Sequence, residues 1–340
     1  MKKLLNTLYV STQGLYLRQE GETVVVELKQ EVKLRLPIHT LSGIVCFGNV
    51  MCSPFLLGLC SQRGVHVSFL TEHGRFLSRV VGPISGNVLL RQQQFRVVDD
   101  PDRAASLARS IVLSKILNSR SVLRRRIRDH GELEQVTDAA AAMANCARKL
   151  QNTIDINQIR GLEGEAANLY FGVFDCLIVA QKEHFTFQKR SRRPPLDPVN
   201  ALISFFYTLL AHDCVGALES VGLDPQMGFL HALRPGRPSL ALDLMEEFRA
   251  AMADRVALSL INLKQIAAKD FVISESGAVI MNDDARKTAL ATWQKKKQEE
   301  IVHPFLNEKI SLGLLPYAQA LLLARHLRGD LDAYPPFLLR

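Results

Sequence analysis

The stretch from residue 228 to residue 249, GFLHALRPGRPSLALDLMEEFR, combines a loop histidine with a helical apolar pattern and neighbouring carboxylates. His231 stands twelve residues before Asp243, and Glu246 follows three residues after Asp243. On a helix, residues three apart project from one face. The apolar residues recur at helical spacing from Leu240 onward, as Leu244, Met245, Phe248 and Met252. The stretch therefore predicts a helix that carries two adjacent carboxylates beside a loop histidine.

Two carboxylates on one helix face repel each other unless a cation lies between them. A divalent metal would supply that cation, and so would the guanidinium of Arg234, Arg237 or Arg249. The same pattern is also common on solvated helix faces, and a single histidine is commonly a surface or core residue. This stretch alone leaves the three interpretations open.

Composition narrows the class of protein. The chain has 340 residues, enough for two domains, with 47% hydrophobic and 22% charged residues, which is typical of a globular protein. The net charge of +8 favours a polyanionic partner, nucleic acid or a membrane surface, although such a charge also serves solubility. The sequence contains no run of eighteen apolar residues, so it predicts no membrane-spanning helix. The start MKKLLNTLYVSTQG lacks the long apolar segment of a signal peptide. Six cysteines without a CxxC pair indicate a reduced, cytoplasmic protein without a cysteine zinc site.

Residues 1–84 predict a small β-rich domain. Short alternating runs rich in β-branched and aromatic residues are separated by turn signals, which favours a small sandwich or barrel. SPFLLGLCSQRG predicts a short helix with Ser53 as its N-cap and Pro54 in its first turn. The expected strands are LNTLYVST, GLYLRQ, TVVVELK, VKLRLPI, LSGIVCFG and a hairpin in GVHVSFLTEHGRFLSRVV.

Residues 85–102 are polar and follow a Gly-Pro pair, so we interpret them as a linker. Helical periodicity then continues through residues 103–340, which predicts an all-α domain. The first long helix carries a basic second half, which either is solvated or contacts phosphates. Its arginines are Arg120, Arg124, Arg125, Arg126 and Arg128.

Glu163 lies in the run RGLEGEAANLYFG, with Gly161 and Gly164 close on either side. A glycine inside a helix costs about 1 kcal/mol relative to alanine. Close approach of another backbone or of a substrate past Glu163 would explain the glycines. Alternatively, they mark a helix start at which Glu163 caps.

The segment 182–195, KEHFTFQKRSRRPP, interleaves Phe185 and Phe187 with basic residues and predicts a loop that contacts nucleic acid. Its basic residues are Lys189, Arg190, Arg192 and Arg193. Asp197 and Pro198 then begin a long apolar helix that runs to about Val221. A polar strip of Asn200, Ser204 and Tyr207 on that helix faces either water or a site.

Glu163, His231, Asp243 and Glu246 together offer one nitrogen and several oxygens, a donor set that suits Mg²⁺ or Mn²⁺, with the imidazole favouring Mn²⁺. Surrounded by basic residues and hydroxyls, such a set suits metal-assisted phosphoryl transfer. The runs RGLEGEAA, DPVNALISFFY and GFLH…R…SLALDLMEEFR, in this order, resemble the CRISPR-associated integrase family, the endonuclease and integrase of spacer acquisition in prokaryotic adaptive immunity. The resemblance covers essentially the whole chain.

The resemblance implies an N-terminal β-sandwich that dimerises and a C-terminal helical catalytic domain. It implies homodimers that flank a small ferredoxin-like second adaptation protein, and capture of short duplex DNA whose 3′-hydroxyls are joined to the repeat array by transesterification. The implied metal ligands are Glu163, His231 and Glu246, with Asp243 one turn before Glu246. Tyr207 and Arg237 match positions near the family's active site and are expected to bind DNA.

One departure from the family pattern concerns Glu246, because the family often has Asp there. Spacing alone does not distinguish Glu246 from Glu247, and Glu165 is a poorer alternative to Glu163. Two other functions also fit the residues: a non-catalytic nucleic-acid scaffold, and an all-α metal-dependent phosphohydrolase acting on small nucleotides.

Overall fold

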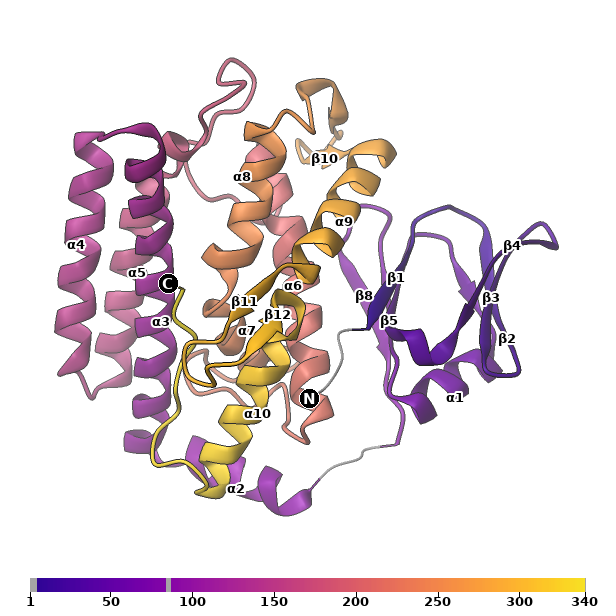
Figure 1. Ribbon diagram of the computed structural model, residues 1–340, viewed down its shortest axis with the longest axis horizontal. Helices are drawn as coiled ribbons and strands as arrows, with labels where there is room; N and C mark the ends of the chain where they lie inside the picture. Colours follow the sequence, from indigo (N-terminus) through magenta and orange to yellow (C-terminus); the bar gives the residue numbers. More distant parts are fainter. Residues whose placement is uncertain (1–4, 84–86, 340) are drawn as a thin grey trace.

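The computed structural model of the protein describes residues 5–83 and 87–339. The basic start at residues 1–4 and the domain boundary expected between residues 84 and 85 lie outside these ranges. Figure 1 shows the N-terminal strands at one end of the molecule, with α3, α4 and α5 at the other end and the remaining helices between them.

The N-terminal strands form two four-stranded sheets, with the orders β1-β5-β7-β8 and β4-β3-β2-β6. The expected strands and the hairpin of β7 and β8 are confirmed, and the side chain of Ser53 caps the expected helix α1 by accepting from the amide of Leu56. The elements are β1 (Asn6–Val10), β2 (Leu15–Glu20), β3 (Thr23–Leu28), β4 (Glu31–Pro37), β5 (Leu41–Phe47), β6 (Met51–Cys52), α1 (Pro54–Arg63), β7 (His66–Leu70) and β8 (Phe76–Val80).

Strand β5 is buried on both faces because it separates two hydrophobic cores. Ile44 and Cys46 point into a core shared by both sheets and α1. Val45 and Phe47 alternate with them and join the large helical core, where the rings of Phe47 and Phe205 lie 6.1 Å apart. The N-terminal sheets are therefore packed directly against the helices.

The segment expected as a linker is mostly helical. Asn87 caps α2 (Val88–Val98), whose Leu90 and Val97 are buried. Buried Gln94 accepts from the amide of Asp224 and donates to the carbonyls of Asp224 and Met227. The linker interpretation is wrong for α2, because its polar glutamine holds the loop just before Gly228 rather than facing water.

The remaining chain is mostly helical, but two short antiparallel hairpins, β9–β10 and β11–β12, contradict the expectation of an all-α region. These strands have three residues each, too few for an alternating pattern to separate them from turns. The elements are α3 (Pro101–His130), α4 (Glu134–Gln151), α5 (Ile156–Gly172), α6 (Pro198–Ser220), α7 (Ser239–Glu246), α8 (Arg255–Asn262), β9 (Phe271–Ile273), β10 (Val279–Met281), α9 (Asp283–Gln298), β11 (Glu300–Val302), β12 (Lys309–Ser311) and α10 (Leu315–Arg328).

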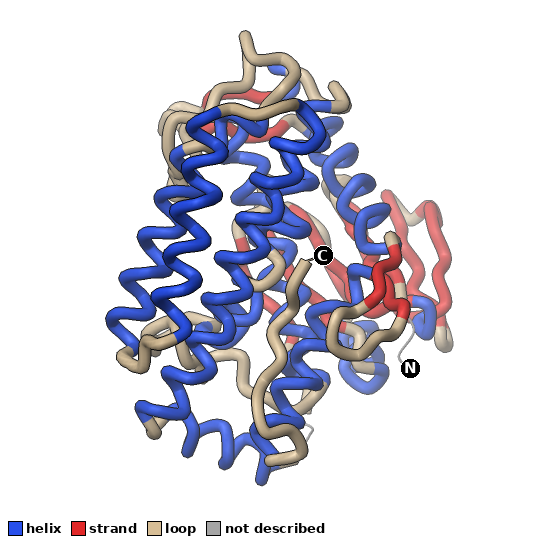
Figure 2. The backbone as a smooth tube through the Cα atoms, turned by 60° about the vertical axis from the view of Figure 1, so that its left-hand side comes forward, coloured by secondary structure: helices blue, strands red, loops and turns tan. Residues whose placement is uncertain are grey.

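Helix α6 runs through the middle of the helical region, with Asp197 as its N-cap and Pro198 in its first turn as expected. Among the described residues it alone is long and apolar enough to span a membrane, and 56% of its most apolar window is buried inside the structure. Its apolar face belongs to the large core, so packing accounts for its composition. After α10 the chain returns as a loop along the helices (Figure 2).

Candidate active site

Glu163 projects from the middle of α5, between two glycines that lie inside the helix. The helix begins earlier, where Asp155 accepts from the amides of Asn157 and Gln158, so Glu163 is not a capping residue. A Cβ added at Gly161 or Gly164 would meet nothing within 4 Å. No backbone in the described chain therefore approaches these glycines, and of the explanations considered for them only the approach of a substrate stays open.

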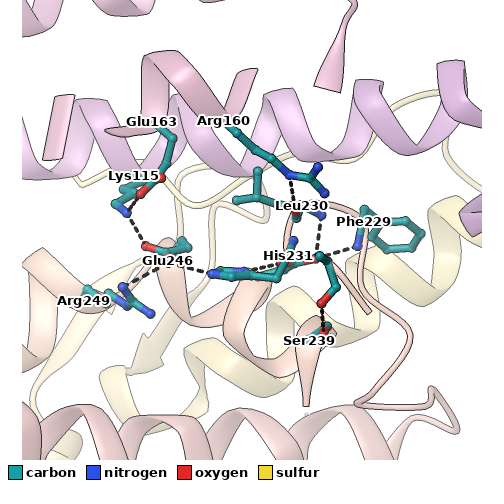
Figure 3. Close-up of polar contacts among 11 residues, drawn as sticks. Lys115, Arg160, Glu163, Phe229, Leu230, His231, Ser239, Glu246 and Arg249 are labelled. Atoms are coloured by element: carbon teal, nitrogen blue, oxygen red, sulfur yellow. Dashed lines mark hydrogen bonds and ion pairs between the residues drawn. The ribbon is translucent and has the colours of Figure 1, made fainter. Parts of the chain in front are cut away.

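The Glu163 carboxylate meets a lysine from another helix. Lys115 of α3 contacts the Oε1 of Glu163, and its ammonium lies 2.8 Å from the Oε2 of Glu246 on α7. Figure 3 shows the lysine between the two carboxylates. The Lys115 side chain is 12% exposed and that of Glu246 only 2%, so three helices bring a charged cluster into a largely buried space.

His231 is held by Asp243, which is fully buried. The Asp243 carboxylate accepts from the backbone amides of Phe229, Leu230 and His231 at 2.6, 2.9 and 3.0 Å. It also lies 2.6 Å from Nδ1 of the imidazole. A carboxylate accepts, so Nδ1 donates to Asp243, and the neutral form of the imidazole then has its lone pair on Nε2. Asp243 thus positions the histidine and has its oxygens engaged within the protein.

Two further features fix the His231 loop. Gly228 is required, because an added Cβ would lie 2.8 Å from the Asp243 carboxylate and 2.7 Å from the backbone carbon of Ser239. Arg160, one turn before Glu163 on α5, donates from Nε to the carbonyl of Leu230 at 2.8 Å. The helix that carries Glu163 therefore also holds the loop that carries His231.

Glu246 completes the cluster. Its Oε1 lies 3.0 Å from Nη1 of Arg249 and 3.8 Å from Nε2 of His231. Burial works to raise the pKa of Glu246, but Arg249, Lys115 and His231 together lower it to about 2. The ammonium of Lys115 lies 2.8 Å from the other oxygen, Oε2. Glu246 is therefore an anion whose Oε2 faces a cationic group.

Glu247, the alternative to Glu246, points to the other side of the chain. Its carboxylate accepts from the hydroxyl of Tyr334, the side-chain amide of Gln319 and the backbone amide of Phe337. Burial raises the pKa of Glu247 to about 7 against these hydrogen bonds. Glu165 is likewise away from the cluster, exposed on α5 beside Cys146 of α4.

The continuous helix expected after Leu240 is interrupted by a π-helical turn, Arg249–Asp254, between α7 and α8. The wider turn places residues five apart on nearly the same side, and such turns are frequent at functional sites. Arg249 and Asp254 consequently both line a cavity of about 370 Å³ next to the charged cluster, together with Lys115, Glu163 and Tyr207.

The polar strip of α6 reaches the cavity through Tyr207. Its hydroxyl donates to Asp254 at 2.9 Å, and Tyr170 donates to the other oxygen of Asp254 at 3.1 Å. The guanidiniums of Arg249 and Arg190 lie 4.8 and 5.4 Å from the Tyr207 ring centre. Arg190 also donates to Asn200 and Ser204, so the whole strip supports an arginine at the cavity wall.

The basic loop is only partly as expected. Lys189, Arg190 and Arg192 line the cavity, whereas Arg193 is exposed outside its lining. Phe185 and Phe187, which alternate with polar and basic residues in this segment, are buried in the core and are not part of its exposed surface.

The other predicted basic residues lie outside the cavity lining. Arg234 is exposed and Arg237 partly exposed on the loop after His231. On α3, Arg126 donates to the carbonyls of Cys176 and Gly131, whereas Arg125 and Arg128 pair with Asp129. Part of the basic half of α3 is therefore used within the structure.

A divalent metal fits the donor set of this cluster. Within residues 5–83 and 87–339, no three His, Cys, Asp or Glu side chains are arranged closely enough to coordinate an ion as they stand. Glu246 nevertheless links the other two candidates: its Oε2 and the carboxylate of Glu163 share the ammonium of Lys115, and its Oε1 lies 3.8 Å from Nε2 of His231.

Sequence reasoning missed three participants: Lys115, Arg160 and Asp254. Lys115 stands on the apolar stripe of its helix, four residues after buried Ile111 and three after buried Val112, and Asp254 ends the buried run 250–253. A charge at a position whose periodicity predicts burial is the signal that would have found both.

Comparisons with known proteins show what the whole chain resembles. A family model described as CRISPR associated protein Cas1 matches residues 8–295. The CRISPR-associated endonuclease Cas1 1 of Chlorobaculum tepidum is 58% identical over 343 residues, which cover 100% of each chain. A solved CAS1 protein from Thermotoga maritima superposes with a TM-score of 0.84 at 25% identity, covering 95% of this chain and 97% of that one. A casposase bound to integration product shares the fold, with a TM-score of 0.84 at 21% identity over 97% of this chain and 93% of that one.

Proposed function

This chain belongs to the CRISPR associated protein Cas1 family, and from that premise we propose that it is a metal-dependent DNA endonuclease and integrase of spacer acquisition. In antiviral defence it would insert short foreign DNA fragments into a CRISPR repeat array by transesterification. The observation that supports the proposal is that Glu246 shares the ammonium of Lys115 with Glu163 and lies 3.8 Å from Nε2 of His231, beside an arginine-lined cavity.

Glu163, Glu246 and His231 would hold Mg²⁺ or Mn²⁺. When bound there, such an ion supplies Lewis-acid chemistry at a phosphodiester: it polarises a phosphate oxygen, activates the attacking hydroxyl and stabilises the leaving oxygen. Asp243 contributes by keeping the proton on Nδ1 of His231, so that the imidazole presents Nε2 as a ligand.

The cavity residues would bind the DNA backbone. Arg249 and Arg190 offer guanidiniums whose Nε–H groups have no hydrogen-bond partner in the described chain, and the face of Tyr207 supports both. Guanidiniums match phosphate geometry and neutralise charge that develops during transfer. Lys189 and Arg192 extend this surface, and Arg234, Arg237 and Arg193 would contact phosphates farther from the reacting bond.

The family also indicates the assembly. We propose a homodimer formed through residues 1–84, which joins a small ferredoxin-like second adaptation protein and captures double-stranded DNA in the cytoplasm. The six cysteines are free thiols, as a reducing compartment requires. The net charge of +8 suits a duplex partner.

A plasmid integration assay tests the proposed activity. The full chain, supplemented with the partner protein where needed, is incubated with a supercoiled plasmid, Mn²⁺ or Mg²⁺ and a short duplex with free 3′ ends. We expect joined product that disappears with EDTA and with a duplex whose ends lack the 3′-hydroxyl. DNA binding that persists in EDTA without any joining would indicate a scaffold, and turnover of nucleotides alone would indicate a phosphohydrolase.

Matched neighbours provide the controls. Glu163→Gln and His231→Ala should abolish joining while the protein stays folded. Glu165→Gln, on the same helix but away from the cluster, should join at the wild-type rate. Full Mn²⁺-dependent joining by His231→Ala would contradict the proposed site.

A further inference from the structure

We propose that Lys115 is the resident counter-ion of this site, and that its ammonium leaves the space between Glu163 and Glu246 when the metal binds. The inference rests on the proposed function, because it concerns the same three ligands. In this inference Lys115 sets how tightly the metal is bound, and metal binding changes the charge of the cavity.

The position of Lys115 requires an explanation. Lysine is rarely buried unless it is paired, yet this side chain is 12% exposed on the inner face of α3. It contacts carboxylates from two different helices, Glu163 of α5 and Glu246 of α7. Without a cation, two carboxylates facing each other in this space would be strongly unfavourable. Lys115 therefore holds the ligand helices together in the metal-free protein.

The charges show why a metal and Lys115 compete. Glu163 and Glu246 contribute two negative charges, and Lys115 and Arg249 contribute two positive ones, so these four side chains balance one another. A divalent ion at the same carboxylates would add two positive charges at contact distance from the ammonium. In a poorly solvated site this repulsion is large. One of the two cations must move away.

Lys115 is the cation that can leave. Arg249 is on the same stretch of chain as Glu246, three residues away, and its guanidinium lies over the Tyr207 ring. Lys115 has a flexible four-carbon stem, and its ammonium contacts the two carboxylates that the metal would occupy, Glu163 and Glu246. It also lines the cavity that Arg190 and Arg192 line. Swinging into that cavity would move its charge toward a bound phosphate.

The first experiment measures the chemical reactivity of lysines in the wild-type full-length protein. Brief acylation with an amine-reactive ester, with or without Mg²⁺ or Mn²⁺, is read out by mass spectrometry. We expect Lys115 to become at least about fivefold more reactive with metal, since a side chain that leaves its ion pairs and enters the cavity is more accessible to the reagent. Lys297 is the internal control, because it is 4% exposed and pairs with Asp213 at 3.0 Å. Its reactivity should not change.

The second experiment measures Mn²⁺ affinity by calorimetry in Lys115→Met, with Lys297→Met as the matched loss of a buried lysine. Without the competing charge, Lys115→Met should bind Mn²⁺ about tenfold or more tightly than wild type. Lys297→Met should bind like wild type.

The outcomes separate the two proposals. Equal or weaker Mn²⁺ binding by Lys115→Met, or a Lys115 reactivity that metal leaves unchanged, overturns the counter-ion inference and leaves the proposed function standing. Failure of wild type and Lys115→Met alike to bind Mn²⁺ overturns both. If Lys115→Met does not fold, the reactivity measurement on the wild-type protein decides the question alone.

Discussion

Glu246 and Glu247 are consecutive in the chain and equally buried, yet they face two chemically different regions. On the site side, Glu246 meets Arg249, Lys115 and His231, and its pKa is lowered to about 2. On the core side, Glu247 meets Tyr334, Gln319 and the amide of Phe337, and its pKa is raised to about 7. Burial penalises both charges, so the partners decide the outcome. Cationic partners keep a buried carboxylate ionised and ready for a metal, whereas neutral donors make it a structural anchor.

The core side explains why the second glutamate is there. Asn118 of α3 donates to the carbonyls of Glu247 and Phe337 at 2.8 and 2.9 Å. Together with Glu247 it fastens the C-terminal segment, the loop of Figure 2, onto the helices. One turn of chain thus places one carboxylate in the proposed metal site and the next in the packing of the C-terminal segment.

The sharpest test of the comparison is Glu246→Gln. The substitution keeps the shape of the side chain but removes the negative charge with which Glu246 would bind the metal. DNA joining should therefore fall by about 1,000-fold or more. A plasmid integration time course measures this loss, and circular dichroism verifies the fold. The paired variant Glu247→Gln should join DNA at close to the wild-type rate. Equal losses in the two variants would remove the distinction between the two sides.

Glu247→Ala should have the second largest effect, and it should act on stability. The substitution leaves the donors on Tyr334, Gln319 and Phe337 without their acceptor, at about 1 kcal/mol or more for each. We expect the free energy of unfolding in urea to fall by about 3 kcal/mol, with earlier proteolytic loss of the C-terminal segment. Mn²⁺ affinity, measured at a temperature where the variant is folded, should stay unchanged. A large loss of Mn²⁺ affinity would show that Glu247 also acts at the site.

Asp243→Asn tests how far the proposed site depends on the carboxylate that holds the His231 loop. An asparagine presents an NH₂ group where the carboxylate now accepts from four N–H groups, so the His231 loop loses part of its support. Because residues that orient a ligand typically contribute about 10- to 100-fold, we expect Mn²⁺ affinity and joining to fall within that range. Gly228→Ala, which crowds the same carboxylate, should reproduce the defect. Wild-type affinity in Asp243→Asn would mean that the loop is held without it.

The smallest expected effect concerns pH and a third buried carboxylate. Burial raises the pKa of Asp254 from 3.8 to about 6, although Tyr207 and Tyr170 hydrogen-bond to it. Between pH 3.8 and about pH 6 the folded protein binds more protons than the unfolded chain. The contribution of Asp254 to the free energy of unfolding is therefore lost as pH rises through 6.

Relative to Asp254→Asn, the wild-type protein should lose about 1 kcal/mol of stability between about pH 5 and about pH 7. Urea unfolding of both proteins across that range measures the difference. The buried imidazole of His212, whose pKa burial lowers to about 4, is common to both and cancels. A difference of the opposite sign would contradict the raised pKa.

Much of the fold follows from local pattern. Alternation in the N-terminal runs, the caps Ser53 and Asp197 and the apolar stripe from Leu244 to Met252 all appear as expected, because each depends on residues close in sequence. The expectations of a linker and of an all-α region were wrong, and the burial of Phe185 and Phe187 was not anticipated, because these features depend on partners far along the chain. Phe187, for example, packs against Phe171 and Phe174.

By itself, the sequence determined that a histidine loop and an acidic helix lie together, since Asp243 is close enough in the chain to bind the amides of 229–231. It could not decide between Glu246 and Glu247, because neighbours on a helix point about 100° apart and periodicity does not say what each will meet. Tertiary packing decided that. It brought Lys115 and Glu163 to one side of the turn and the C-terminal segment to the other, and in a buried space the charge of the partner settles whether a carboxylate is a site or an anchor.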